Sequence, residues 1–136
     1  MSAAILVAAA KGDPSSLRAL TQVAYESTSA PGVSKPLAYM EAITLARLTA
    51  AHGNPTDVRV IIYLLSEFAA FWSEQGEPAL ALHFEAQALH VAEAFAEDGD
   101  DGLADMVAAA ADQIPECVHL EVRRLRELEA ARCTER

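Results

Sequence analysis

Apolar residues recur at helical spacing along most of the chain, and this pattern predicts an all-α protein. In the segment 77–96 the apolar side chains recur every three or four residues, at Ala81, Phe84, Ala88, Val91 and Phe95. An α-helix turns once in about 3.6 residues, so this spacing places them on one face of a helix. Outside such patterns, no stretch of five residues alternates apolar and polar side chains as a half-buried strand does.

Turn-forming residues divide the chain into six or seven predicted helices. Glycine ends helices and proline suits their first turn, so breaks are expected at Gly12, Gly53 and Gly76, each followed within two residues by proline. The predicted helices cover about 2–11, 14–27, 36–52, 57–75, 77–96, 103–113 and 115–136. Short connections make sequential helices antiparallel. We therefore expect a single all-α domain over 1–136, built as a helical bundle or as a short stack of helix pairs.

The segment 57–75 has the widest apolar surface and is predicted to lie at the centre of the fold. Apolar side chains cover more than half of its circumference, so it must contact more than one neighbour. We expect Trp72 to be buried between this helix and the helix at 77–96. The remaining narrow strip is free to meet solvent or a partner, and its candidate partner-binding residues are Arg59, Tyr63, Ser66, Glu67, Ser73 and Glu74.

The segment 36–52 has two faces that could pack against other helices. One is an apolar stripe at helical spacing, which is typical of a core-facing surface, and it contains Leu37, Met40, Thr44, Leu48 and Ala51. The other is formed by Ala42, Ala46 and Ala50 and is smooth enough for a neighbouring helix to approach closely.

Residues 62–95 resemble a tetratricopeptide repeat, a pair of antiparallel helices that stacks with further pairs. The positions that define the repeat are held, in the family's spacing, by Leu65, Phe68, Ala69, Trp72, Gly76, Ala81 and Ala88. The resemblance implies that the two helices pack closely at the alanines and that Gly76 relieves the backbone strain of the turn between them. The chain shows no second copy at the repeat's period of about 34 residues, so a repeat-like stack and a non-repeat bundle both remain open.

The resemblance also bears on the kind of partner. Tyr63, Ser66, Ala70 and Ser73 take the positions that line the family's concave groove. Family members that bind acidic C-terminal tails have lysines and asparagines at these positions, and this chain has neither residue type at the four positions. A neutral or basic peptide is therefore the expected ligand of such a groove.

Glu85 is the residue that helix packing explains least. It projects toward the apolar side of its predicted helix, where a carboxylate needs a partner to offset the cost of leaving water. An ion pair with Arg47 or Arg59 would supply one. Alternatively, Glu85 would contact a ligand in a small helical-bundle enzyme or ligand-binding protein.

Other candidate chemistry is sparse. His83 and His90 lie seven residues apart, whereas metal-binding pairs on a helix are commonly four apart, and no third ligand is placed by the spacing. We expect these histidines to lie with Gln87 on a solvated polar face. No Gly-rich phosphate loop or nucleophile–base set is present. We therefore expect no metal, no cofactor and no enzymatic activity.

The distribution of charge is uneven. The formal net charge of −10 disfavours nucleic acid and anionic membranes as partners. No Lys or Arg occurs between Arg59 and Arg123, an interval rich in Asp and Glu, and half of the basic residues follow it: Arg123, Arg124, Arg126, Arg132 and Arg136. On the last predicted helix an apolar stripe lies among these arginines. We expect a homodimer whose interface contains Val118, Val122, Leu125, Leu128, Arg123 and Arg126.

These features favour a non-enzymatic adaptor or scaffold that binds a protein or peptide. The alternative is an acidic inhibitor or immunity-type protein that masks a basic target. The longest apolar run is far shorter than the roughly 20 residues needed to cross a bilayer. Only two cysteines are present, which agrees with a reducing compartment, so we expect a cytoplasmic protein.

Overall fold

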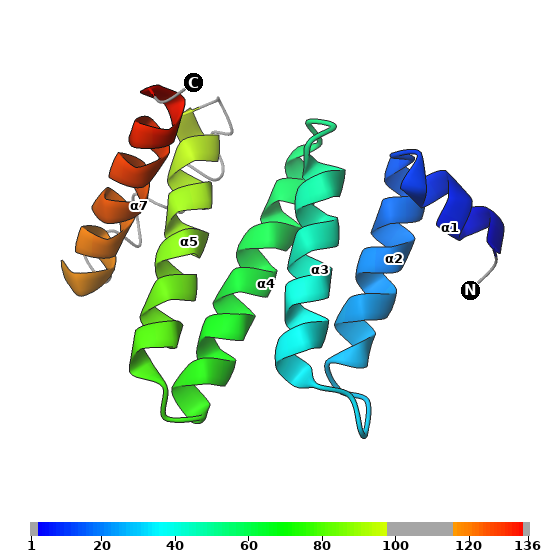
Figure 1. Cartoon of the computed structure of the whole chain (residues 1–136), viewed down its shortest axis with the longest axis horizontal. Coiled ribbons are helices and arrows are strands. Elements are labelled where there is room, and N and C mark those ends of the chain that lie inside the picture. Colours follow the sequence, from blue (N-terminus) through cyan, green and yellow to red (C-terminus); the bar gives the residue numbers. More distant parts are fainter. Residues whose placement is uncertain (1–2, 98–115, 135–136) are drawn as a thin grey trace. The chain divides into compact units, whose positions relative to one another are not determined.

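The computed structural model describes residues 3–97 and 116–134, and in this part of the chain every regular element is an α-helix (Figure 1). The helices are α1 (Ala3–Ala10), α2 (Pro14–Ser27), α3 (Lys35–Ala50), α4 (Pro55–Glu74), α5 (Pro78–Glu97) and α7 (Glu116–Thr134). The predicted all-α fold is confirmed. The helix predicted near 103–113 lies outside the described residues.

Contacts along the chain define two compact units, residues 1–64 and residues 65–136. The boundary falls inside α4, so residues 55–64 of this helix belong to the first unit and residues 65–74 to the second. The prediction of one domain over the whole chain stays a prediction.

The corner between α1 and α2 shows why the chain turns where it does. Gly12 has a φ of +88°, which an L side chain rarely adopts, and the next residue donates its N–H to the carbonyl of Ala8 at 3.0 Å. The Asp13 carboxylate then accepts hydrogen bonds from the hydroxyl and the backbone N–H of Ser16, at 2.7 and 2.9 Å. These bonds lower the pKa of the Asp13 carboxyl. The predicted N-cap at Asp13, with Pro14 opening α2, is confirmed.

In the first unit, α2 packs against α3, and two side-chain pairs link α2 to α4. Arg18 pairs with Asp57, and Tyr25 contacts Tyr63. The two pairs follow in the same order along both helices, Arg18 before Tyr25 and Asp57 before Tyr63, so α2 and α4 run parallel. The apolar core of this unit contains Leu17, Ala24, Tyr39, Ala42, Ile43, Ala46, Val58, Ile61 and Leu64.

The expectation that the leucine stripe of α3 faces a core is wrong. Ala42 and Ala46 are 0% and 2% exposed, so the helix buries its smooth face. The stripe lies on the opposite side of the helix and is exposed, with 71% of Leu37, 45% of Met40 and 54% of Leu48 accessible. Tyr39 and Ile43, beside the alanines, are also buried, at 5% and 4% exposed.

The second unit is built on a tight helical hairpin and a third helix. Gly76, with a φ of +74°, ends α4, and Glu77 donates its N–H to the carbonyl of Trp72 at 3.0 Å. Eight residues before and after Gly76, the rings of Phe68 and Phe84 lie 4.4 Å apart, so residues 65–74 of α4 pack antiparallel to α5. The buried residues Ala86, Leu89, Val118 and Val122 join α5 to α7.

Trp72 does not lie buried between the two helices of this hairpin as predicted. It is only partly buried, and its ring contacts are with Phe68 and Phe71 of its own helix, at centroid distances of 5.7 and 5.1 Å. Phe68, which is 1% exposed, takes the central position instead.

Candidate functional site

A pocket of about 330 Å³ opens in the first unit. Its walls come from α2, from the last turns of α3, and from the start of α4 with the residue before it. They consist of Arg18, Thr21, Gln22, Ala46, Thr49, Asn54, Thr56, Asp57 and Val60. This volume is at the lower end of the range for small-ligand pockets, and it would hold one side chain or a fragment of similar size.

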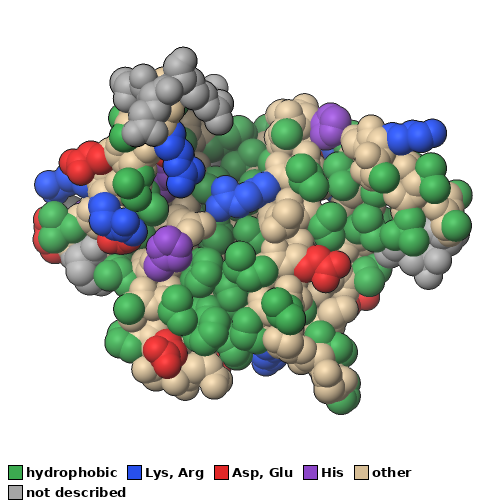
Figure 2. Space-filling model, in the orientation of Figure 1, with side chains coloured by type: hydrophobic (Ala, Val, Ile, Leu, Met, Phe, Trp, Pro, Cys, Tyr) green, Lys and Arg blue, Asp and Glu red, His purple; other side chains and the backbone are tan. Residues whose placement is uncertain are grey.

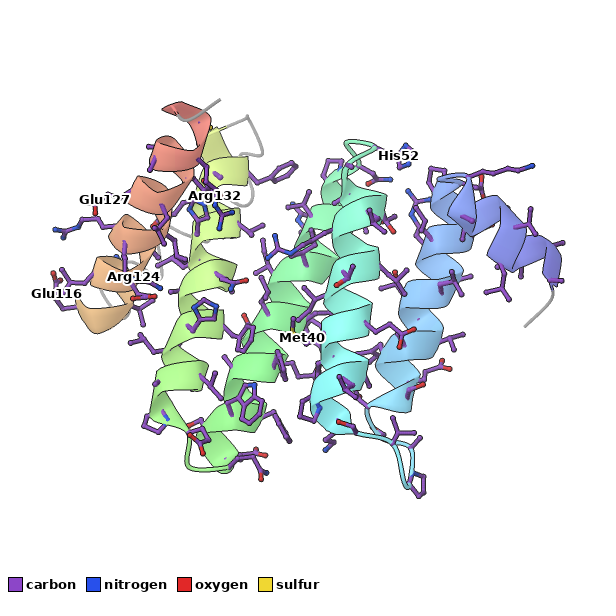
Figure 3. All side chains as sticks on the ribbon, viewed as in Figure 1. Met40, His52, Glu116, Arg124, Glu127 and Arg132 are labelled. Carbon is purple, nitrogen blue, oxygen red and sulfur yellow. The ribbon has the colours of Figure 1, made fainter. Side chains whose placement is uncertain are left out.

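The charged centre of the pocket is a bidentate ion pair. The Nε and Nη2 groups of Arg18 donate to the two carboxylate oxygens of Asp57, each at 2.8 Å. The Asp57 side chain is 6% exposed, whereas that of Arg18 is 43% exposed. These hydrogen bonds lower the pKa of the Asp57 carboxyl against the opposing effect of burial, and the charge of His52 adds to the lowering. His52 lies at the turn between α3 and α4 (Figure 3).

The pocket offers both donors and acceptors to a ligand. Arg18 has five N–H groups and uses two of them on Asp57, so three are left on a residue that lines the pocket. The hydroxyls of Thr21 and Thr49 donate to backbone carbonyls at 2.7 and 2.8 Å, so their oxygens remain acceptors. Asn54 accepts from the backbone N–H of Thr56 through Oδ1, which leaves its amide group as a donor.

Replacing Arg18 with methionine is expected to destabilise the fold at neutral pH, because the Asp57 carboxylate would then be buried without its partner. The pKa of Asp57 is lowered in the folded state, so the pair stabilises the protein above the unfolded pKa of about 3.9. This stabilisation disappears as the pH falls through the lower folded pKa. The difference between the variant and the wild type should therefore shrink in acid.

Urea unfolding at neutral pH and near pH 3 measures this effect. Lys11→Met, which removes one positive charge from an exposed position, is the control for net charge. A loss of stability in Arg18→Met that is the same at both pH values would contradict the prediction.

The strip of α4 predicted to meet a partner is at the surface for most of its length. In the first unit Arg59 is exposed and Tyr63 is 57% exposed. The Tyr63 hydroxyl lies 3.2 Å from that of Tyr25, and the two rings meet edge to face at 6.1 Å. In the second unit the exposed strip residues are Ser66, Ser73 and Glu74, whereas Glu67 is half-buried.

The polar face of α5 packs against α7 and is not the solvated surface that was expected. His83 is hydrogen-bonded to Gln87 at 2.6 Å, and its Nδ1 lies 4.0 Å from the Glu121 carboxylate. His90 lies 3.0 Å from the Glu129 carboxylate, and its side chain is 15% exposed. The later histidine of α5 meets the later glutamate of α7, so α5 and α7 run parallel, as Figure 1 shows. Both histidines help to hold α7 on α5.

Glu85 does not form the buried acidic site that its position suggested. It is exposed, so its carboxylate remains in water and needs no partner to offset desolvation. Within residues 3–97 and 116–134, no three His, Cys, Asp or Glu side chains gather closely enough to hold a metal ion.

Three of the four apolar residues proposed for a dimer interface on α7 pack against the chain's own α5. Val118 and Val122 are 2% and 4% exposed and Leu125 packs beside them, whereas Leu128 is 45% exposed. Arg126 binds the Glu93 carboxylate of α5 at 2.6 Å. Val118 and Val122 are therefore not accessible to a second subunit, whereas Leu128 and Arg123 are exposed, and the homodimer through α7 stays a prediction.

The remaining charges of α7 pair along the helix itself. Arg123 lies 3.7 Å from Glu116, and Arg124 binds Glu121, which lowers the pKa of the Glu121 carboxyl. Figure 3 labels Glu116, Arg124, Glu127 and Arg132 on this helix.

No family model matches the chain, and comparisons with curated proteins and with solved structures give no match. Within the described helices, none combines the length and the hydropathy that a membrane span requires.

Proposed function

We propose that this chain is a non-enzymatic protein-interaction module of helical-stack type, and that it binds a neutral or basic peptide along α2 and the first half of α4. The observation that carries the proposal is the lined pocket beside two parallel helices in residues 1–64. The tetratricopeptide-like pattern of residues 62–95 supports a stacked architecture, since such stacks place alternate helices parallel to each other.

One face of α2 supplies a series of contacts for an extended ligand. Arg18, Gln22 and Tyr25 are spaced by four and three residues, so they share a face of the helix. Arg18 and Gln22 line the pocket, and Tyr25 contacts the exposed Tyr63 of α4. A peptide along this face would place one side chain in the pocket and would reach an aromatic pair further on.

Electrostatics favours a neutral or basic peptide over an acidic one. Asp57 already neutralises Arg18, so a ligand carboxylate would gain little from this guanidinium. The faces of tyrosine rings attract cations, which suits a lysine or arginine of the ligand at Tyr63. The chain's net charge of −10 also attracts a basic segment.

The acidic-inhibitor alternative receives less support. Such a protein would present its carboxylates to a basic target. In the second unit, Glu93, Glu121 and Glu129 each lie beside a basic side chain of the chain itself. Glu93 and Glu129 pair between α5 and α7 and Glu121 pairs within α7, so fewer carboxylates are left to face a target than the number of acidic residues suggests.

Selection of neutral and basic peptides from a displayed library against the wild-type protein tests the proposal. Peptides so obtained should bind Gln22→Ala and Tyr63→Ala about tenfold more weakly, by fluorescence anisotropy, which corresponds to about 1.4 kcal/mol for each variant. Val23→Ala, at an exposed position next to Gln22, is the matched control. Peptides that bind Tyr63→Ala and Gln22→Ala as tightly as the wild type would refute this site. Binding that weakens steeply with salt and is unaffected by Gln22→Ala and Tyr63→Ala would instead favour a charge-driven inhibitor.

A further inference from the structure

α3 presents a row of mostly apolar side chains to solvent. Leu37, Met40 and Leu48 are 71%, 45% and 54% exposed, and Thr44 and Ala51 complete the row. Scattered exposed leucines are normal in a soluble protein, whereas large apolar side chains aligned on one helix face are typical of an interaction surface. Met40 is labelled in Figure 3, and Figure 2 draws the same view in space-filling form with hydrophobic side chains in green.

The row is symmetric about Thr44. At about 100° per residue, Leu37, Met40, Leu48 and Ala51 all lie within about 40° of the direction of Thr44 around the helix. Glu41 and Arg47 lie about 60° away from it, on opposite flanks. Both are exposed, and Glu41 makes no ion pair with any residue of the described chain. An apolar centre with one acidic and one basic flank can be complementary to a copy of itself.

We infer that this row is the surface through which two copies of the chain associate, with α3 packed parallel to the partner's α3 about a two-fold axis. The apolar row supplies burial, because each copy covers the other's Leu37, Met40 and Leu48. The small Thr44 at the centre allows the two helices to approach closely.

The charges on the flanks determine the direction. In a parallel pair, Glu41 lies on the same flank as the partner's Arg47, about 9 Å along the axis, a distance that these two long side chains can bridge together. The two-fold axis produces two such pairs. In an antiparallel pair each flank would bring together two glutamates or two arginines. A guanidinium can bind two carboxylates, so in the parallel pair Arg47 can bind the partner's Glu41 and keep its contacts within its own chain.

The size of the row sets the strength of the association. Stable interfaces bury about 800 Å² on each partner, and a row with three large apolar side chains falls below this value. We therefore expect a reversible dimer that forms as the concentration rises from micromolar toward millimolar. This dimer does not depend on the proposed peptide site, which lies on α2 and α4.

Sedimentation equilibrium over this concentration range tests the association. The wild type should dimerise, and Leu37→Ser combined with Leu48→Ser should weaken dimerisation at least about tenfold. Both positions are exposed, so the fold should be retained, and circular dichroism checks this. Leu120→Ser on α7, where the leucine is 53% exposed, is the matched control and should dimerise as the wild type does.

Disulfide cross-linking tests the direction. In a chain whose Cys117 and Cys133 are changed to serine, Met40→Cys should form a disulfide with the same position of the second copy, because a parallel pair brings the two residues together. In an antiparallel pair the two positions would be about 12 Å apart along the axis, beyond the roughly 7 Å that a disulfide allows between Cα atoms.

Three results would overturn the inference. The first is a wild-type chain that remains monomeric throughout the concentration range. If the cause is that another part of the same chain covers the row, the double serine variant should also unfold at a lower denaturant concentration than Leu120→Ser. The second is a dimer that the double serine variant leaves unchanged. The third is a dimer in which Met40→Cys forms no disulfide but cross-links to Leu48→Cys, which would show antiparallel packing.

Discussion

Replacing Val122 with aspartate is expected to release α7 from α5, whereas the same replacement at Leu120 should leave the two helices paired. Val122 is 4% exposed and packs with Ala86 and Leu89 of α5, so a carboxylate there would be buried without a partner. Leu120 is 53% exposed on the same helix. A buried charge without compensation costs about 3–5 kcal/mol, which is comparable with the stability of a small domain.

Hydrogen exchange of backbone amides gives the most direct measurement. In Val122→Asp, the amides of α7 should exchange rapidly, while those of α2 and α3 in the other unit keep their protection. Leu120→Asp introduces the same charge on the same helix and should leave the protection of α7 unchanged. Equal effects of the two substitutions would show that α7 does not dock through the face that contains Val118 and Val122.

Phe68→Ala is expected to be the most destabilising truncation of a single side chain in the second unit. Phe68 is 1% exposed, and its ring contacts those of Phe71, Trp72 and Phe84. Removing it eliminates these contacts and leaves a cavity between α4 and α5, at a cost of about 3–5 kcal/mol. Trp72→Ala should cost less, because the indole is only partly buried and contacts side chains of its own helix.

Denaturant unfolding of Phe68→Ala and Trp72→Ala, followed by circular dichroism, tests this order. Leu80→Ala is the control for an apolar truncation on the same hairpin, since Leu80 is 38% exposed. If Trp72→Ala proved more destabilising than Phe68→Ala, the tryptophan and not Phe68 would fill the space between the two helices.

The boundaries of the helices were predictable because local chemistry determines them. Gly12, Gly53 and Gly76 all adopt positive φ at the ends of helices, and Asp13 caps the helix that follows. Such positions depend on the backbone of a few adjacent residues. The all-α class follows in the same way from the spacing of apolar side chains.

The faces that the helices bury were harder to predict, because a face is selected by its neighbour. On α3 the leucine stripe has more apolar area, yet the alanine face is buried since it allows a closer approach. On α5 the face with His83 and His90 is polar, and it packs against α7 because carboxylates of that helix lie opposite both histidines. Neither outcome can be derived from one helix alone.

The candidate site was not predicted from the sequence for a related reason. Arg18 is a single basic residue on α2, and Asp57 looks like an ordinary acid in the first turn of a helix, where acids are common. Only the parallel packing of α2 and α4 brings the two together. By contrast, the surface position of Tyr63 could be predicted, because it follows from the apolar stripe of its own helix.

The position of the Arg18–Asp57 pair in the sequence bears on when it forms during folding. Its members are 39 residues apart in the sequence, so in an unfolded chain the pair would have to close a long loop for a modest gain in energy. Once α2 and α3 have folded back on each other, the start of α4 is already near α2, and the loop left to close is short. We therefore expect the pair to form after the rate-limiting step of folding and to act mainly on the rate of unfolding, because interactions absent from the transition state slow the opening of the native fold without hastening its formation.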